Sequence, residues 1–544
     1  MPKSRSRWRG ARALTLGLLV ALGAAGCSGG ASDEPIPGVQ RPNGPEPAGG
    51  TELPEPPAEF TGQDLDWGEC GRPTIRQGSG PAPEPLPDGT PWECATLTVP
   101  LDYAHPDPEG ETIDLALIRA AAAPGREHLG SLVFNFGGPG GSGVAALPRS
   151  GDDYAALHEG YDLVSFDPRG VGESDGVVCL DGAEIDRSGQ QDDGPPETPA
   201  QEQAYLVDAR EYAAACEARA GDLLPHMTTE YAARDLDLLR QALGDRHLNY
   251  FGISYGTKLG GVYAHLFPER VGRTVFDAVV DPTRDVVERA LLQTEGFQLA
   301  LDNYLDDCAA REGPCPAGGS GAGPAAYQRL NALLDALGDR PLPTDTDREL
   351  TQGLAVTGML GLLYSQGSWE YLTSALLQMR DEGRGDLLLA AAENYNGRDD
   401  AGHYRNVHAA NRAVNCADFA SRPTLATVHE QRDAFVAASP VFGPHLLWGL
   451  LSCTNWPVTG EQDQPEVSAA DAAQPILLLA TTGDPATPYV GAERMREELG
   501  EGVGVLLTYD GEGHGAYGDG DTCVTEAVDA HLLAGTLPDD GTVC

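Results

Sequence analysis

The chain has 544 residues, enough for a large core with an insertion or for two domains. Its formal net charge is −46, because 82 Asp and Glu residues outnumber 36 Lys and Arg residues. Nucleic-acid binding needs a basic surface, so this charge argues against DNA or RNA as a partner. It suits solubility outside the cell, and it would weakly attract cationic substrates such as peptide N-termini.

The N-terminal residues 1–26 are typical of a bacterial export signal. Five basic residues precede the apolar run 13–23, which is too short to span a membrane in the mature protein. Small residues then lead to Cys27 in a pattern that resembles a lipobox, although Ala24 stands where leucine is usual. We therefore predict a lipoprotein anchored through Cys27 to the outer face of the cell membrane, with some protein released. The alternative is ordinary signal cleavage and secretion.

Residues 27–59 are predicted to be the anchor cysteine and a disordered tether. They are rich in Pro, Gly, Ala and Glu and hold almost no large apolar side chain, so they cannot bury enough surface to fold.

The cysteines indicate disulfide bonds. Of the eleven, ten remain without Cys27, an even number behind an export signal. The sequence leaves the connectivity open, and the spacing suggests that neighbours pair: Cys70–Cys94, Cys179–Cys216, Cys308–Cys315, Cys416–Cys453 and Cys523–Cys544. No Cys-x-x-Cys or His-x-x-x-His pair is present, so we expect no metal site.

Residues 60–281 show the strand and helix pattern of a sheet protein. The alternating segments 94–99 and 112–118 predict an antiparallel entry to the sheet. A helix over 228–244 is predicted from its threonine cap and apolar spacing. Further strands are predicted at 130–136, 161–167, 248–253 and 273–281. Alternating strands and helices predict an α/β fold, with a mainly parallel sheet and helices on both faces.

Helical patterns dominate residues 282–464, where no clear strand is predicted. The expected helices are 287–311, 325–338, 350–364, 368–395, 404–419 and 425–438. The core pattern returns in residues 465–544, with strands at 475–480 and 504–509. We therefore predict a large helical cap inserted between two parts of one core.

Ser254 is the predicted nucleophile. It stands in a Gly-x-Ser-x-Gly turn between a predicted strand and a predicted helix, which is the context of the nucleophile elbow in α/β-hydrolases. Gly252 and Gly256 let the backbone pass where side chains would not fit, and the serine Oγ is then presented over a helix N-terminus. The same pattern surrounds Ser28, next to the export signal, and Ser174, which no helix follows directly. The bland alternative for Ser254 is an ordinary strand-to-helix turn.

A serine nucleophile needs a base, and the base needs an orienting acid. In α/β-hydrolases both follow the serine, with the acid before the histidine. His514 lies in a glycine-flanked loop after a strand and is the predicted base. Asp484 follows strand 475–480 and is the predicted acid, or else only a turn aspartate before proline. Asp281, beyond another predicted strand, is the competing acid.

The oxyanion of the reaction needs two backbone N–H donors. We expect them from Tyr255, just after the nucleophile, and from Gly138 in the glycine-rich loop 137–143. Such a loop can instead cradle a phosphate, but this one has no Lys-Ser or Lys-Thr, and Pro139 removes one N–H. We therefore expect no nucleotide or other cofactor.

Several motifs together resemble the prolyl-aminopeptidase-related serine peptidases, and in particular the secreted and lipid-anchored bacterial tripeptidyl aminopeptidases. The motifs are Gly137-Gly-Pro-Gly, Asp167-Pro-Arg-Gly-Val-Gly-Glu-Ser174, Gly252-Ile-Ser-Tyr-Gly256, Asp484-Pro-Ala-Thr-Pro488 and Gly513-His-Gly515. The resemblance covers about residues 60–544 and implies an α/β-hydrolase fold with a cap. It also implies that tripeptides are released from free peptide N-termini through an acyl-enzyme. We expect a monomer, although the sequence does not determine the oligomeric state.

The resemblance carries residue roles as well. It implies a triad of Ser254, Asp484 and His514, with Thr487 bracing the acid and the histidine. Asp418, next to a cap cysteine, is the candidate for holding the substrate amine, and the alternative is a solvated or helix-capping aspartate. The motifs are less specific for a peptidase than for the fold. A carboxylesterase with the same triad and a noncatalytic surface lipoprotein are the competing interpretations.

Overall fold

The computed structural model describes residues 53–544 except 124, 126, 192 and 193. Cys27 and the predicted export signal lie outside the described residues. The predicted tether reaches residue 59, but the side chain of Leu53 already packs against the core, and helix α1 (Ala58–Thr61) buries Phe60. These two apolar side chains attach the chain to the core earlier than its proline-rich composition indicates.

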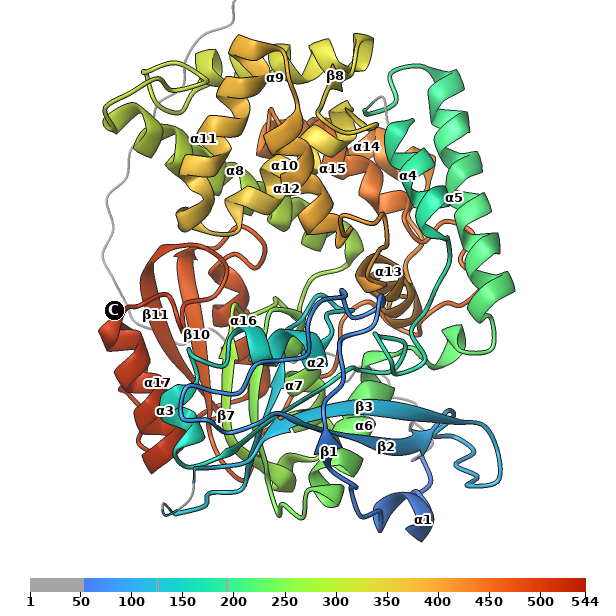
Figure 1. The fold of residues 1–544 in the computed structure, drawn as a ribbon, viewed down its shortest axis with the longest axis vertical. Coiled ribbons are helices and arrows are strands. Elements are labelled where there is room, and N and C mark those ends of the chain that lie inside the picture. The colour runs from blue at the N-terminus through green and yellow to red at the C-terminus, as the bar shows by residue number, and fades with distance from the viewer. Residues whose placement is uncertain (1–52, 124, 126, 192–193) are drawn as a thin grey trace, which may run out of the picture. The chain divides into compact units, whose positions relative to one another are not determined.

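A ten-stranded sheet forms the core and confirms the predicted α/β class (Figure 1). The pairs β1–β2, β2–β3 and β3–β5 are antiparallel, as the alternating segments predicted, and the other neighbours are parallel. In spatial order the strands are β1 (Gly68–Glu69), β2 (Glu93–Pro100), β3 (Thr112–Ala120), β5 (Asp162–Phe166), β4 (Ser131–Asn135), β6 (Leu248–Ile253), β7 (Val271–Asp277), β10 (Ile476–Gly483), β11 (Gly504–Glu512) and β12 (Thr542–Val543).

Helices cover both faces of this sheet because its strand residues alternate between two apolar clusters. In β10, Ile476 and Leu478 join one cluster, whereas Leu477 and Leu479 join the other. The first cluster includes side chains of α6 (Thr229–Ala242), α7 (Tyr255–Leu266) and α16 (Val490–Leu499). The second includes side chains of α3 (Ala155–His158) and α17 (Thr522–Ala534). The carboxyl ends of the central strands are left free to build a site.

A helical cap lies over that end of the sheet, with an apolar core of its own (Figure 1). Its helices are α8 (Val286–Ala310), α9 (Pro324–Asp339), α10 (Gln352–Leu363), α11 (Trp369–Leu377), α12 (Asp386–Asn396), α13 (Val407–Asp418), α14 (Leu425–Ala438) and α15 (Gly443–Leu446).

Two features of the cap differ from the sequence prediction. The expected helix 368–395 is broken after a π-helical turn (Gln378–Glu382), because Gly383 takes a left-handed φ of 64°. The cap also contains a two-stranded ribbon, β8 (Leu342–Pro343) with β9 (Glu349–Leu350), where no strand was expected. Strands of two residues are too short to show an alternation of polar and apolar residues in the sequence.

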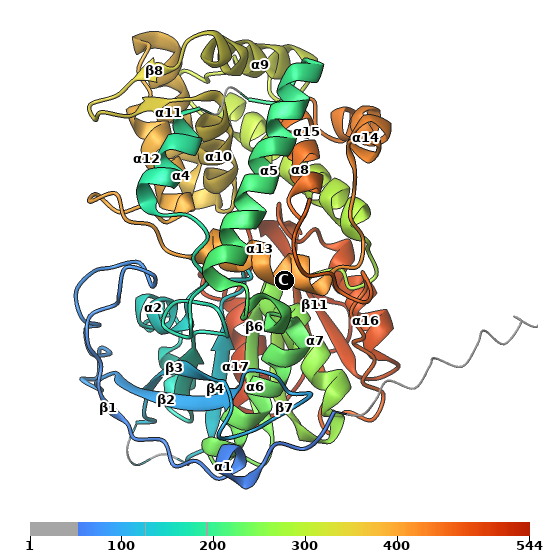
Figure 2. The same ribbon diagram turned by 90° about the vertical axis from the view of Figure 1, so that its right-hand side faces the viewer.

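Part of the helical layer comes from before the nucleophile. Helices α4 (Gly182–Gln190) and α5 (Pro199–Ala220) lie beside the cap, although the sequence prediction placed them in the core (Figure 2). In α4, Asp186 forms ion pairs with Arg348 and Arg398, and in α5 the Tyr205 hydroxyl donates to the Trp448 carbonyl at 2.9 Å. Of the helices that the structure describes, including the long α5 and α8, none has the length and hydrophobicity needed to cross a bilayer.

All five disulfide bonds suggested by spacing are present. They join Cys70 to Cys94, Cys179 to Cys216, Cys308 to Cys315, Cys416 to Cys453, and Cys523 to Cys544. Each closes a loop in the chain, which stabilises the fold mainly by constraining the unfolded state.

Candidate active site

Ser254 stands at a sharp turn between β6 and α7. Its φ is 58° and its ψ is −122°, a backbone conformation that residues with a side chain seldom adopt and that costs on the order of 1–3 kcal/mol. The turn is held by its neighbours, since the Ser254 carbonyl accepts bonds from the Thr257 N–H at 2.8 Å and the Thr257 hydroxyl at 2.7 Å. Strain retained at one residue is a feature of functional sites.

The glycines on either side of the turn are required by close approach. A Cβ at position 252 would lie 2.5 Å from the Gly256 carbonyl oxygen, and a Cβ at position 256 would lie 2.6 Å from the Asn135 carbonyl oxygen. Both distances are shorter than any side chain tolerates. The reason for which the sequence predicted an elbow at Ser254 therefore holds in the structure.

The glycine-rich loop after β4 lies directly against this turn. A Cβ on Gly137 would meet the Ser254 Cβ at 2.9 Å and the Tyr255 nitrogen at 3.1 Å. Gly137 and Gly138 both have positive φ, of 79° and 112°. Within the described residues, neither the Gly138 N–H nor the Tyr255 N–H has a hydrogen-bond acceptor. Two backbone donors beside a serine hydroxyl suit a developing oxyanion.

Asp484 and His514 form a hydrogen-bonded pair on adjacent loops. The His514 Nδ1 lies 2.9 and 3.0 Å from the two carboxylate oxygens of Asp484, which is fully buried. Asp484 follows β10, and His514 follows β11, the next strand in the sheet. Because a carboxylate only accepts, Nδ1 carries the proton and Nε2 is free to take another.

The carboxylate of Asp484 is itself held by three donors. Its Oδ1 accepts from the backbone N–H groups of Ala486 and Thr487, each at 2.9 Å. Its Oδ2 accepts from the Thr487 hydroxyl at 3.0 Å, and the same hydroxyl lies 3.4 Å from the His514 Nδ1. Thr487 thus sits where the resemblance placed it, against both members of the pair.

The environment of His514 favours its charged form. Burial lowers the pKa of the imidazole, but the charge of Asp484, the hydrogen bond to it, and the charge of Asp277 together raise the pKa above its ordinary value. A base with a raised pKa accepts a proton from a serine hydroxyl more readily.

Ser254 is connected to His514 through the backbone rather than by its side chain. In the described part of the chain, no hydrogen bond joins the Ser254 hydroxyl to the His514 ring. Catalytic contacts are often long before substrate binds. The connection runs through Asp277, whose carbonyl accepts the Ser254 N–H at 3.0 Å and whose carboxylate accepts N–H groups just after His514.

Sequence reasoning missed Asp277 because it extended the strand too far. The expected strand 273–281 ends at Asp277 in the structure, and Ala278 turns away with a φ of 56°. The competing acid, Asp281, does not pair with the histidine: it accepts from the Thr283 hydroxyl at 2.6 Å and pairs with Arg284 at 3.0 Å. The sequence did contain a signal for Asp277, namely an acidic residue within an apolar strand segment.

The alternative serine, Ser174, has a structural environment. It is fully buried, its hydroxyl donates to the Asp167 carbonyl at 2.6 Å, and the same oxygen accepts the Ala116 N–H at 2.9 Å. Its bonds hold the loop after β5 against β3, so the hydroxyl is not available to a substrate.

Asp418 does not have a free carboxylate. Its Oδ2 accepts from the Lys258 ammonium and from the Thr229 hydroxyl, both at 2.6 Å, and its Oδ1 accepts the Thr229 N–H at 2.7 Å. These bonds tie α13 of the cap to the start of α6 and to α7 of the core. The structure does not support the expected role of Asp418 in holding a substrate amine, because protein donors already surround its carboxylate.

The cap reaches the catalytic loops at two points. The backbone N–H of His514 donates to the backbone carbonyl of Tyr364 at 2.9 Å, and the Tyr364 ring packs edge-on against the His514 ring. A Cβ on Gly140 would lie 2.5 Å from the Val407 carbonyl oxygen at the start of α13. The cap thus packs against both the histidine loop and the glycine-rich loop.

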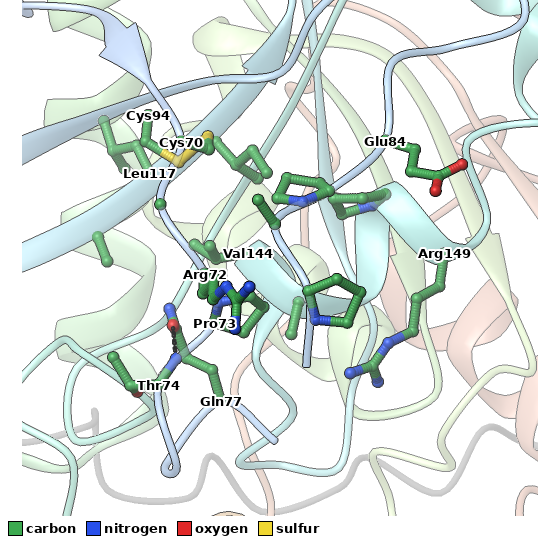
Figure 3. Close-up of a pocket in the computed structure, with 18 of the residues that line it drawn as sticks. Cys70, Arg72, Pro73, Thr74, Gln77, Glu84, Cys94, Leu117, Val144 and Arg149 are labelled. Atoms are coloured by element: carbon green, nitrogen blue, oxygen red, sulfur yellow. Dashed lines mark hydrogen bonds between the residues drawn. A yellow bond between two sulfur atoms is a disulfide. The ribbon is translucent and has the colours of Figure 1, made fainter. Parts of the chain in front are cut away.

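A cavity of about 720 Å³ lies beside this region, between the segment 70–87 and the start of the sheet (Figure 3). Its lining includes Arg72, Leu117 and Arg149, and Val144 of the short helix α2 (Gly143–Ala146) that follows the glycine-rich loop. None of Ser254, Asp484 and His514 lines it. Bond cleavage by these residues would take place outside this cavity.

Comparison with known proteins gives relatives along nearly the whole chain. The family model described as TAP-like protein matches residues 439–544, the segment that contains Asp484 and His514. The chain is 37% identical to the serine protease Hip1 of Mycobacterium tuberculosis, over 89% of this chain and 91% of that protein. It is also 37% identical to carboxylesterase B of M. tuberculosis, over 83% and 86% of the two chains.

A third relative is the tripeptidyl aminopeptidase of Streptomyces lividans, 32% identical over 87% of this chain and 84% of that one. Together with the strand order, the elbow and the cap, these likenesses establish the family. The chain belongs to the TAP-like α/β-hydrolase serine peptidases, and it is a serine hydrolase.

Proposed function

We propose that this serine peptidase releases tripeptides from the free N-termini of peptides, with Ser254 as nucleophile, His514 as base and Asp484 as orienting acid. The observation that carries the proposal is the Asp484–His514 pair on the loops next to the elbow of Ser254. The tripeptide product rests on the likeness to a tripeptidyl aminopeptidase along 87% of the chain.

The first half of the reaction forms an acyl-enzyme. His514 takes the Ser254 proton at Nε2 while Oγ bonds to the scissile carbonyl carbon, whose oxygen becomes an oxyanion. The N–H groups of Gly138 and Tyr255 donate to that oxyanion. The intermediate collapses when the C–N bond breaks and His514 passes its proton to the leaving amine.

The second half reverses the roles. A water molecule gives a proton to His514 Nε2 and attacks the ester carbonyl, and the proton then returns to Ser254 Oγ as the tripeptide acid leaves. The Asp484 carboxylate stabilises the imidazolium that forms twice. Thr487 keeps the carboxylate aligned with Nδ1 through the 3.0 Å bond to Oδ2.

The position of the cap supports an exopeptidase over an endopeptidase. Tyr364 packs on His514, and α13 packs on Gly140, so the catalytic loops are flanked by cap residues on two sides. A chain end enters such a site more easily than the middle of a polypeptide. An acid that holds the substrate amine is still required, and Asp418 is occupied by Lys258.

One assay separates this proposal from its alternatives. Rates are measured on Ala-Ala-Pro-p-nitroanilide, on its N-acetylated form, and on p-nitrophenyl butyrate. We expect the free tripeptide substrate to be cleaved with much the highest kcat/KM. Equal rates on the blocked peptide would argue for an endopeptidase. A preference for the ester would favour the activity for which carboxylesterase B, a relative 37% identical to this chain, is named.

We also propose that the enzyme is a lipoprotein on the outer face of the cell membrane. The support is the basic, apolar and small-residue order of residues 1–26 before Cys27. Replacing Cys27 with Ser should move the enzyme from the membrane fraction or block its processing. An unchanged fractionation would point to ordinary secretion.

A further inference from the structure

Asp277 is a buried carboxylate at the carboxyl end of β7, directly beneath the candidate triad. It is 2% exposed, and its strand lies between β6, which leads to Ser254, and β10, which leads to Asp484. The chemistry proposed above gives it no role. A charged group without a counter-cation at such a position is costly, so its contacts need an explanation.

The contacts of Asp277 join the two loops that must meet for catalysis. Its carboxylate accepts the Ala516 N–H at 3.1 Å and the Tyr517 N–H at 3.0 Å, two and three residues after His514. Its backbone carbonyl accepts the Ser254 N–H at 3.0 Å. One residue therefore holds both the elbow and the histidine loop, which no side-chain bond connects in the described residues.

The histidine loop is built to receive this carboxylate. Gly515 has a φ of 92°, and its backbone lies close to Asp277. A Cβ on Gly515 would be 3.5 Å from the Asp277 carboxylate. The two N–H groups that follow both point to the same acceptor. Removing that acceptor would leave two buried donors unpaired and release the loop that carries the base.

Asp245 provides a comparison within the same sheet. It is a partly buried carboxylate, and it also accepts a backbone N–H, that of Ser131 at 3.1 Å, but at the opposite, amino-terminal end of β4. Burial raises the pKa of Asp245, as it does that of Asp277. The two acids thus share chemistry and differ in whether they touch the catalytic loops.

We propose that Asp277 is a positioning residue that sets the distance between Ser254 and His514, and that its charge adds to that of Asp484 in stabilising protonated His514. The inference rests on the proposed triad. It gives this enzyme two carboxylates behind one histidine: Asp484 bonded to the ring, and Asp277 bonded to the backbone that carries the ring.

The charged and titratable groups around this pair are few. Asp277 faces His514, Asp484 and the hydroxyl of Tyr154, and His514 faces Asp484, Asp277 and the Tyr364 ring. Burial raises the pKa of Asp277 to about 6, although the Tyr517 and Ala516 N–H groups and the charge of His514 oppose that rise. At pH 7 and above, Asp277 is therefore ionised and acts on His514 as a charge.

The test compares Asp277→Asn with Asp245→Asn on whichever substrate the wild type cleaves best. Rates are counted per reactive site, by titration with a serine-directed fluorophosphonate, so that a partly folded sample still gives a kcat. We expect Asp277→Asn to lower kcat roughly tenfold to a hundredfold with KM changed little. The acid limb of its kcat/KM profile should move to lower pH, because His514 has lost one stabilising charge.

Asp277→Glu separates charge from geometry. It keeps the charge in a longer side chain, so the acid limb should stay near that of the wild type while kcat falls. Asp245→Asn should lower the unfolding temperature and leave kcat and the acid limb unchanged. If neither Asp277 variant folds, wild-type protein with 13C-labelled aspartate should show a carboxyl titrating near pH 6 whose midpoint moves in His514→Gln.

Three results would overturn the proposal: an Asp277→Asn variant with wild-type kcat per reactive site and an unmoved acid limb, the same changes in Asp245→Asn, or no carboxyl coupled to His514. Failure of the proposed function is recognised separately. In that case Ser254→Ala keeps its activity, or the wild type prefers blocked peptides or esters, whatever the Asp277 variants do.

Discussion

Two carboxylates, the buried Asp484 and the partly buried Asp418, each bind a basic side chain, yet only one of them is arranged for catalysis. Asp484 lies 2.9 Å from the His514 Nδ1, and Asp418 lies 2.6 Å from the Lys258 ammonium. Both also accept a backbone N–H and a threonine hydroxyl: Thr487 for the first and Thr229 for the second. Residue type and immediate bonding therefore do not distinguish them.

The difference lies in whether the basic partner has a second nitrogen that can exchange a proton. Histidine has a second nitrogen, and when Asp484 holds Nδ1, the Nε2 can take and return a proton. Lysine has only donors, and Lys258 is 6% exposed, with its ammonium packed over the Phe419 ring. In the proposed mechanism the first pair transmits a proton, whereas the second pair joins the cap to the core.

The largest effect on kcat is expected at Ser254, the proposed nucleophile. Ser254→Ala should lower kcat by on the order of 10⁶, because no other described serine stands at an elbow. Steady-state rates with the peptide anilide measure it. Ser174→Ala is the matched control and should keep kcat per folded molecule; loss of turnover there with activity retained in Ser254→Ala would move the nucleophile.

Asp484→Asn should lower kcat by on the order of 10⁴, because an amide no longer selects the imidazole tautomer that leaves Nε2 free. Asp281→Asn is the control, since that acid pairs with Arg284 instead. The rates of both variants on the same anilide decide between the two acids. A greater loss in Asp281→Asn would reverse the assignment made here.

The pH profile should separate the two buried pairs. The pKa of His514 is raised, chiefly by Asp484 acting against burial, so kcat/KM of the wild type should fall below a pH that lies above the ordinary histidine value. The base is active only when neutral, hence a lower pKa in Asp484→Asn should move this acid limb to lower pH. Asp418→Asn should leave the limb unmoved; a shift there would mean that the Lys258 pair is coupled to catalysis.

Asp418→Asn should act on stability. It leaves the Lys258 ammonium buried without its counter-charge, which should lower the free energy of unfolding by about 3–5 kcal/mol. Denaturant titration measures this, and kcat per folded molecule should fall less than tenfold. In the double variant with Lys258→Met part of the stability should return, because the buried ammonium is removed together with its partner, while the buried Arg289 still loses the charge of Asp418. A double variant as unstable as the single one would contradict the ion-pair explanation.

The smallest effect is expected at Thr487, which is bonded to Asp484 but does not touch the proton. Thr487→Val removes one hydrogen bond to a charged group and should reduce kcat about tenfold. Thr482→Val provides the control, because Thr482 lies at the end of β10, five residues earlier, and its hydroxyl binds Asp510 instead of Asp484. Equal rates in the two variants would show that Thr487 does not brace the pair.

Features of the site that are formed by residues close together in the chain could be predicted from the sequence. The elbow at Ser254 and its flanking glycines depend on contiguous residues, and the structure has the close approaches that require those glycines. The structure also brings His514 next to Asp484. The disulfides also followed spacing, since each joins sequence neighbours. Helix α14 begins and ends at the predicted residues 425 and 438, where a threonine cap starts the apolar pattern.

What the sequence by itself determined was thus the class of fold, the helical insertion and the turn at Ser254, because backbone sterics and hydrophobic periodicity act over a few residues. The tertiary structure alone decided the rest. Strand β7 ends at Asp277, α4 and α5 join the cap, and Asp418 binds Lys258, each through contacts with segments far away in the chain. The function of a buried carboxylate depends on such partners, since its charge must be matched by whatever the fold brings next to it.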